Sequence, residues 1–196
     1  MPRDAMIVPL KRFDVAKERL RRAGATDVSA LAQELADRVI GECAPRHVIV
    51  LSESDDITQF ATQRGAEVRR SNARDLNEAV QGAYDALSER FDRLFIVHGD
   101  LRLPVGLGTF EPTSDVTIVT DHHATGTNVL VVPTGAGFQF AYGPGSAARH
   151  ESEARRLGLG VVVHTDSPWR YDVDEPGDLE ILPEQHERGP GGPLSS

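Results

Sequence analysis

The chain has 196 residues, a size that fits one domain with one substantial core. Its 30 acidic residues outnumber its 21 basic ones, and the net charge of −9 argues against general binding to nucleic acid or to an anionic membrane surface. Cys43 is the only cysteine, so no intramolecular disulfide can form. No stretch has the length and apolarity of a membrane span or a signal peptide, and we expect a cytoplasmic protein.

Apolar runs and amphipathic segments alternate along the chain. The runs predict buried strands at residues 6–10, 48–51, 66–69, 94–97, 116–119, 129–132 and 161–163. Asp14 is expected to cap a first helix, Ser29 a second that ends near Cys43, and Asp55 or Asp56 to open a third that Gly65 closes. Repeating strand–helix units predict an α/β fold with a mostly parallel sheet. We expect one domain over residues 1–182 and a disordered tail over 183–196.

Basic residues gather where the first strand meets the first helix. Lys11 and Arg12 follow the strand, and Lys17 and Arg19 lie at the start of the predicted helix. A basic loop before a helix N-terminus can cradle phosphate, although a solvated helix face would carry the same charges. The Walker A sequence of P-loop ATPases is absent.

A polar loop leads into a predicted helix whose apolar face begins at Leu76. Asn72, Asp75 and Asn77 offer donors and acceptors that could read the edge of a nucleobase. The same residue types serve equally well in turns and helix caps, which is the better interpretation from the sequence alone.

Three aspartates mark places where extended segments end. Asp100 follows the strand at 94–97 after a glycine that permits close backbone approach. Asp172 and Asp174 are two residues apart, so on an extended segment both point to one face, and Pro176 suits the first turn of a following helix. Each site could be a plain surface turn. Together, three hard oxygen ligands without a cysteine favour Mg²⁺ or Mn²⁺ over Zn²⁺.

Two polar loops in the second half of the chain offer anion sites. The loop at 121–128 ends in Thr127 and Asn128, whose hydroxyl and amide suit a small carboxylate or phosphate. A glycine-rich loop at 142–145 leads into a predicted helix at Ser146. The two loops suggest that an acidic acceptor is held at the edge of the sheet. The histidines are scattered and are typical of structural polar residues.

Six short motifs, in this order, resemble the phospholactate and phosphoenolpyruvate guanylyltransferases that build the deazaflavin coenzyme F420. They are VPLK at 8–11 with AKERL at 16–20, DLNEA at 75–79, GDL at 99–101, GTN at 126–128, YGPGSAARH at 142–150 and DVDEPGDL at 172–179. Each motif is weak alone, but the ordered set is specific and spans residues 6 to 182. The chain departs from the family pattern at Arg102, where proline is usual, and at Tyr142, where phenylalanine is usual.

The resemblance implies a fold and a set of site residues. The fold would be a three-layer, Rossmann-like nucleotidyltransferase of the MobA-like type. Asp100, Asp172 and Asp174 would bind the metal, taken to be Mg²⁺. The acceptor would be held by Thr127, Gly143 and Ser146, with Asn77 and Asn128 as further substrate-binding candidates. The catalytic cations facing the phosphates of GTP would be Lys11, Lys17 and Arg19.

The expected reaction is transfer of GMP from GTP to phosphoenolpyruvate or 2-phospho-L-lactate, with release of pyrophosphate and hand-over of the product to the downstream transferase of the pathway. A phosphate monoester is already a nucleophile, which explains why the chain offers carboxylates, cations and glycine loops but no nucleophilic side chain. Two alternatives stay open: a related nucleotidyltransferase with another phosphorylated acceptor, and a non-catalytic nucleotide-binding module. The residues do not choose between the two acceptors, or between GTP and ATP.

Overall fold

The computed structural model describes residues 3–179, and within this part of the chain every predicted strand is present. The strands are β1 (Asp4–Pro9), β2 (His47–Ser52), β3 (Glu67–Arg70), β4 (Arg93–Val97), β5 (Val116–Thr120), β6 (Thr127–Pro133) and β7 (Val161–His164). The α-helices are α1 (Glu18–Arg22), α2 (Val28–Glu42), α3 (Asp55–Thr62), α4 (Leu76–Leu87) and α5 (Ser146–Arg156). The described residues also form three 3₁₀ turns, which are η1 (Leu107–Thr109), η2 (Pro168–Arg170) and η3 (Pro176–Leu179).

The strands form one sheet in the order β3-β2-β1-β4-β6-β5-β7. All neighbours pair in parallel except β6, which is antiparallel to both β4 and β5. The reason is the short connection between β5 and β6, which makes a hairpin, whereas a parallel pairing needs a long crossover. The prediction of a mostly parallel sheet is confirmed, with one reversed strand inside it.

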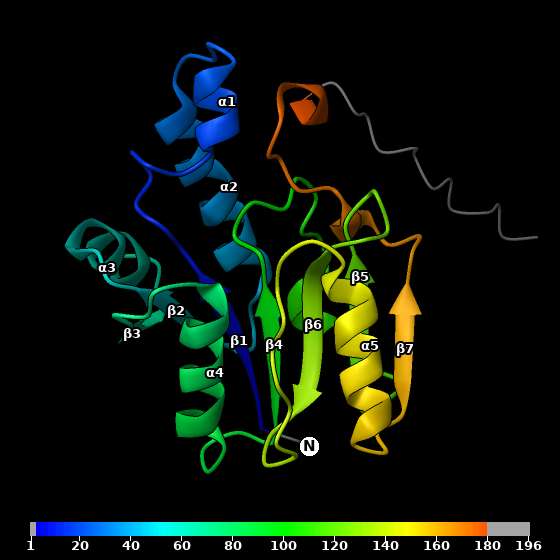
Figure 1. Cartoon of the computed structure of the whole chain (residues 1–196). Helices are drawn as coiled ribbons and strands as arrows, with labels where there is room; N and C mark the ends of the chain where they lie inside the picture. The colour runs from blue at the N-terminus through cyan, green and yellow to red at the C-terminus, as the bar shows by residue number, and fades with distance from the viewer. Residues whose placement is uncertain (1–2, 180–196) are drawn as a thin grey trace, which may run out of the picture.

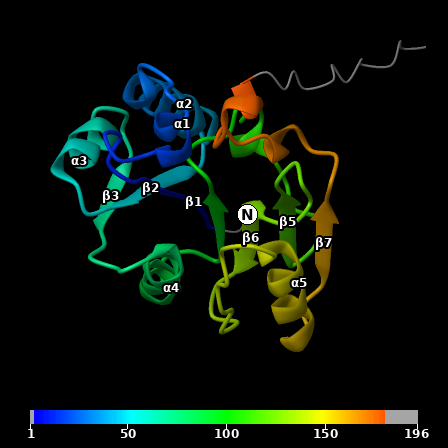
Figure 2. The ribbon, with the colours of Figure 1, turned by 45° about the horizontal axis from the view of Figure 1, so that its top comes forward.

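Helices cover both faces of the sheet, as Figures 1 and 2 show. Side chains alternate along each strand, so Ile7 of β1 belongs to the apolar cluster that includes residues of α4 and α5, while Met6 and Val8 belong to the cluster on the other face, which includes residues of α2 and α3. Both apolar layers are fully buried at the central strands, where Phe95 and Ile96 are 1% and 0% exposed. The predicted three-layer α/β architecture is therefore confirmed.

Two helix starts differ from the sequence prediction. Asp14 does not cap α1, because it accepts from Arg12 Nε at 3.0 Å and lies in a turn before the helix. α1 begins only at Glu18, after Lys17 with its left-handed backbone (φ +60°). Likewise Asp27, and not Ser29, occupies the N-cap position of α2, again with a left-handed backbone (φ +55°). Left-handed residues that are not glycine interrupt a helical run in a way that periodicity does not reveal.

Other predicted ends are close to the observed ones. α3 begins at Asp55 as expected, and Gly65 follows it with a positive φ of +75°. Asp75 caps α4 by accepting from the backbone N–H of Glu78 at 2.9 Å, which confirms the capping interpretation of that residue. Asp172 lies on an isolated bridge to Leu101 and not on a regular strand. The helix predicted at residue 176 is the short turn η3, and the tail predicted at 183–196 lies outside the described residues.

No helix between residues 3 and 179 combines the length and the apolarity that a membrane crossing requires.

Candidate active site

The predicted site residues meet at one edge of the sheet because β6 runs against its neighbours. β1 and β4 end at this edge and β6 begins there, with Val97 of β4 opposite Val129 of β6. The backbone N–H of His98 donates to the carbonyl of Asn128 at 3.0 Å, which extends the pairing by one step. The start of β6 therefore lies beside the loop that carries Asp100. Ligands of open α/β sheets bind at this kind of edge.

The segment after η2 returns to the same edge and brings two further carboxylates. Leu101 forms a bridge with Asp172, and the backbone N–H of Val173 donates to the carbonyl of Asp100 at 3.2 Å. The carboxylate of Asp178 accepts from the backbone N–H groups of Asp174 and Glu175, at 2.8 and 2.7 Å. Asp174 is thus held at a fixed backbone position next to Asp100.

Arg102, one of the two departures from the family pattern, helps to join these segments. Its backbone N–H donates to the carbonyl of Tyr171 at 2.7 Å, a bond that proline could not make. Its guanidinium donates to the carbonyl of Asp178 at 2.6 Å. The loop after β4 and the acidic segment are therefore linked through main-chain and side-chain bonds of one residue.

Lys17 lies between the carboxylates instead of facing solvent. Its ammonium pairs with Asp100 and, at 3.0 Å, with Asp174, and its side chain is only 6% exposed. Burial alone would lower the pKa of Lys17, but the two carboxylates outweigh this and raise it. Burial alone would raise the pKa of Asp100, but the ammonium of Lys17 outweighs this and lowers it. Both groups are therefore held in their charged forms.

Asp172 stands in a different environment from Asp100. Burial and the negative charge of Asp100 raise its pKa, partly offset by a hydrogen bond of 3.1 Å from the Asn128 amide. The same amide donates to the carbonyl of Trp169 at 3.1 Å, so Asn128 is fixed and buried. A carboxylate destabilised by neighbouring acids is one that a bound cation would stabilise.

The three aspartates predicted as metal ligands do not converge as a metal site among the described residues. Within the described residues, no three His, Cys, Asp or Glu side chains converge as metal ligands, and Lys17 lies among the three predicted here. The Oδ1 atom of Asp100 is buried and has no hydrogen-bond partner in the described part of the chain. An unsatisfied carboxylate oxygen beside Asp172 is a hard ligand of the kind that Mg²⁺ uses.

Thr127 and Ser146 meet at the start of β6 and of α5, as the two-loop prediction expected. The Ser146 hydroxyl donates to Thr127 Oγ1 at 3.1 Å, and His150 Nδ1 lies 3.1 Å from the same oxygen. The backbone N–H of Ala141 donates to His150 Nε2 at 3.0 Å, so the proton of the neutral ring is on Nδ1 and is donated to Thr127. Burial lowers the pKa of His150 to about 4, which keeps the ring neutral.

Sequence reasoning missed this role of His150, although a signal was present. His150 follows Ser146 by four residues, so on a helix the two side chains lie on one face. Both accepting positions of Thr127 Oγ1 are occupied by donors. Its own hydroxyl proton is the remaining group that it can offer to a ligand.

The loop before α5 is held in place by two side chains. The Asn77 amide accepts from the backbone N–H of Tyr142 at 2.6 Å and donates to the Tyr142 carbonyl at 3.2 Å. Arg149 donates to the carbonyls of Ala141 and Pro144, from Nη2 at 2.8 Å and from Nη1 at 2.5 Å. Gly143 has a φ of +118°, which a residue with a side chain rarely adopts. Asn77 therefore supports the loop in this structure.

Among the described residues, neither of the other two predicted cations, Lys11 and Arg19, forms an ion pair with the three aspartates. The Arg19 guanidinium pairs with Glu175 at 3.0 Å, and both side chains are more than half exposed. Lys11 is exposed on the loop after β1. A cavity of about 520 Å³ lies beyond the ends of β2 and β3, and Asn72 from the predicted base-reading loop is part of its lining. The lining residues are Arg12, Glu53, Ser54, Asp55, Asp56 and Asn72.

Comparison with known proteins identifies the family of this chain. The family model described as "Guanylyl transferase CofC like" matches residues 4–187. The chain belongs to the CofC-like guanylyl transferase family. This confirms the resemblance drawn from the six motifs.

Relatives and solved structures agree with this membership. A phosphoenolpyruvate guanylyltransferase of Sphaerobacter thermophilus is 32% identical, with 90% of each chain covered. A 2-phospho-L-lactate guanylyltransferase of Methanothermobacter thermautotrophicus is 31% identical, with 90% of this chain and 82% of that one covered. The structure of a nucleotidyl transferase from the same archaeon is similar in fold, with a TM-score of 0.63, 13% identity, and coverage of 90% and 94%. The nucleotidyltransferase fold predicted from the sequence is therefore confirmed.

Proposed function

We propose that this CofC-like protein transfers GMP from GTP to phosphoenolpyruvate or 2-phospho-L-lactate and releases pyrophosphate, in the biosynthesis of coenzyme F420. The observation that carries the proposal is the meeting of Asp100, Asp172 and Thr127 at one edge of the sheet, in a chain of the guanylyl transferase family. The curated relatives named for these two acceptors cover nine-tenths of this chain. The product is handed to the transferase that consumes it.

The reaction requires that the acceptor phosphate be positioned at the α-phosphorus of GTP and that the negative charge of the phosphates be neutralised. A phosphate oxygen of the acceptor attacks the α-phosphorus of GTP, the bond from that phosphorus to the bridging oxygen of the β-phosphate breaks, and pyrophosphate leaves with the electron pair. The attacking oxygen is already anionic, so no side chain has to remove a proton. This agrees with a site whose charged residues are aspartates and a buried lysine.

Asp100, Asp172 and Asp174 would hold the divalent cation, which we take to be Mg²⁺. When bound, it would neutralise charge on the reacting phosphates. The unpartnered Oδ1 of Asp100 and the raised pKa of Asp172 support this assignment. Asn128 orients Asp172 through the hydrogen bond from its amide.

Thr127, Ser146 and Gly143 would hold the acceptor. Thr127 has a hydroxyl proton to donate, since Ser146 and His150 already donate to its oxygen. Gly143 brings main-chain donors close to the ligand without a side chain in the way. Asn77 contributes by fixing the backbone of the neighbouring residue.

The basic residues would neutralise the phosphates of GTP. Lys11 and Arg19 are exposed, so a triphosphate could reach them. Lys17 lies beside Asp100 and Asp174, and with a metal ion held by these carboxylates its ammonium would be able to bind a phosphate instead.

The test is release of pyrophosphate by the purified protein with GTP and Mg²⁺. Phosphoenolpyruvate, 2-phospho-L-lactate and a reaction without acceptor are run in parallel, with the consuming transferase added to draw off the product. Release that depends on one acceptor supports the proposal and identifies the substrate. A protein that binds GTP but releases nothing with either acceptor would contradict it and favour another acceptor or a nucleotide-binding module.

A further inference from the structure

The loop between β1 and α1 carries Lys17 to the carboxylates, although it contains neither helix nor strand. Lys17 itself has a φ of +60° and a ψ of +44°, a left-handed conformation that residues with a side chain rarely adopt. Such a conformation persists only where the surrounding structure holds it. The contacts that fix this loop therefore decide where the Lys17 ammonium lies.

Arg21 makes three hydrogen bonds around this loop. Its Nε donates to the carbonyl of Ala16 at 3.0 Å, and its Nη2 donates to the carbonyl of Phe13 and to the hydroxyl of Ser29, each at 2.7 Å. A guanidinium has its donors in a rigid, planar fork, so one side chain can make all of these bonds. The loop is thereby tied to α1 through Arg21 and to α2 through Ser29.

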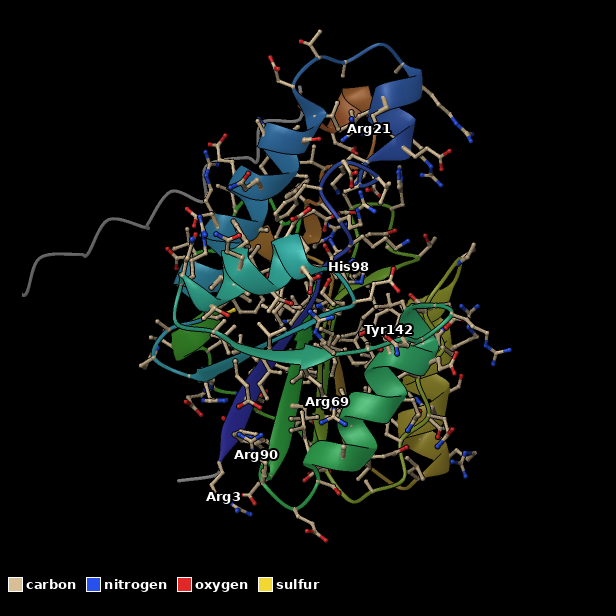
Figure 3. The ribbon with its side chains drawn as sticks, turned by 90° about the vertical axis from the view of Figure 1, so that its left-hand side faces the viewer. Arg3, Arg21, Arg69, Arg90, His98 and Tyr142 are labelled. Atoms are coloured by element: carbon tan, nitrogen blue, oxygen red, sulfur yellow. The ribbon has the colours of Figure 1, made fainter. Side chains whose placement is uncertain are left out.

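The position of Arg21 in the chain explains why it reaches the loop. It follows Lys17 by four residues, and its backbone N–H donates to the Lys17 carbonyl at 3.1 Å. Helical side chains point toward the N-terminus of their helix, so that of Arg21 covers the turn before α1. Figure 3 shows Arg21 beside α1, at the end of the molecule opposite to Arg3. The next residue, Arg22, pairs instead with Glu18 on the exposed surface of α1.

We propose that Arg21 is a positioning residue for Lys17. The inference rests on the proposed function for the role of the Lys17 ammonium, which is to neutralise phosphate, and adds the residue that places it. By fixing two carbonyls of the loop, Arg21 holds the conformation from which Lys17 reaches Asp100 and Asp174. The ammonium is then in place before a substrate binds, so no binding energy is needed to order it.

The sequence allows a direct measurement, because Lys11 and Lys17 are its only lysines. The protein in EDTA is treated with an acetylating N-hydroxysuccinimide ester, and mass spectrometry of peptides gives the rate at each lysine. Lys11 is exposed, whereas the Lys17 side chain is 6% exposed and ion-paired, so Lys17 should react at least about tenfold more slowly. In Arg21→Met we expect the rate at Lys17, relative to that at Lys11, to rise by about tenfold.

Three further residues supply the controls. Arg22→Met removes the neighbouring exposed guanidinium and should leave the relative rate at Lys17 unchanged. Cys43 is the only cysteine and is 0% exposed, so a thiol reagent should leave it unmodified in every folded variant. Ser29→Ala removes only the hydroxyl that accepts from Arg21 and should raise the rate at Lys17 by about threefold. This milder variant keeps the inference testable if Arg21→Met fails to fold.

A double variant shows whether Arg21 acts through Lys17. With the acceptor that the wild type uses, Arg21→Met should lower kcat/KM for pyrophosphate release by about tenfold. Lys17→Met should lower it further. Adding Arg21→Met to Lys17→Met should cause no additional loss, because the side chain that Arg21 positions is already gone.

The outcomes separate this inference from the proposed function. An unchanged relative rate at Lys17 in both Arg21→Met and Ser29→Ala overturns it, as does a wild type in which Lys17 and Lys11 react equally fast. An additional loss of kcat/KM in the double variant overturns it too, because Arg21 would then act independently of Lys17. The acetylation rates require no substrate, so selective acceleration at Lys17 supports the inference even in a protein that transfers no GMP.

Discussion

Replacing Lys17 with methionine tests the electrostatic account of the site most directly. The substitution keeps the apolar stem but removes the ammonium that pairs with Asp100 and Asp174. Removal of one partner from a buried ion pair costs about 3–5 kcal/mol. Here Asp100 is 24% exposed and Asp174 is 50% exposed, so solvent screens part of the loss. We expect the free energy of unfolding to fall by about 2–3 kcal/mol in EDTA.

Divalent metal should reverse part of this loss. In Lys17→Met the carboxylates lack their internal cation, so Mg²⁺ would bind them without competition and stabilise the folded state by mass action. In the wild type Mg²⁺ has to displace the ammonium first and should stabilise less. The assay is urea unfolding of both proteins in EDTA and in millimolar Mg²⁺.

Arg19→Met is the matched control for Lys17→Met. Its ion pair with Glu175 joins two exposed side chains, so its loss should change the free energy of unfolding by less than about 0.5 kcal/mol. If Lys17→Met unfolds at the same urea concentration as the wild type in EDTA, the ammonium does not neutralise the carboxylates and the reasoning fails. Equal stabilisation of wild type and variant by Mg²⁺ would show that metal and lysine do not share the site.

Three further predictions concern Asp172, His150 and Arg102. Asp172→Asn should lower pyrophosphate release by about 100-fold or more, because it removes a proposed metal ligand. It should not destabilise the metal-free protein, because the raised pKa of Asp172 shows that its charged form is unfavourable in the fold. A drop in melting temperature would contradict this. The pKa of His150 is about 4 in the folded protein against an ordinary 6.5, so the stability it contributes is complete above pH 6.5 and is lost as the pH falls through 4, by about 3 kcal/mol. An NMR titration that finds the ring protonated near pH 6.5 would refute this. Arg102→Ala loses the bond to the Asp178 carbonyl and should cost about 1 kcal/mol in urea unfolding, with no change expected for the bond from its backbone N–H.

The sequence predicted the layers of this fold well because buried strands have a strong local signal. Val48 to Leu51 and Leu94 to Val97 are apolar on both faces, which only a sheet covered on both sides requires. The reversed direction of β6 was also accessible, since a loop of six residues between β5 and β6 is too short for a crossover helix.

The details of the site depended on contacts that no local pattern contains. Lys17 was expected to face phosphates, but its left-handed backbone and its burial against Asp100 and Asp174 arise from long-range packing. The bond from the Arg102 guanidinium to Asp178 joins residues 76 positions apart in the chain. Asp100, by contrast, was identifiable because it follows β4, whose carboxyl end lies at the edge where open α/β sheets bind ligands.

The reversed strand β6 gives the two halves of the site different freedom to change. The hairpin from β5 sets where Thr127 and Asn128 lie against β4, whereas β1 to β3 lie on the other side of β4 and do not pair with β6. One inserted residue in that hairpin would shift the pairing by one step and turn Thr127 to the opposite face unless the bulge at Val119 and Thr120 absorbed it. A change in hairpin length would therefore move Thr127, which we propose holds the acceptor, without changing the pairing of β1 to β3.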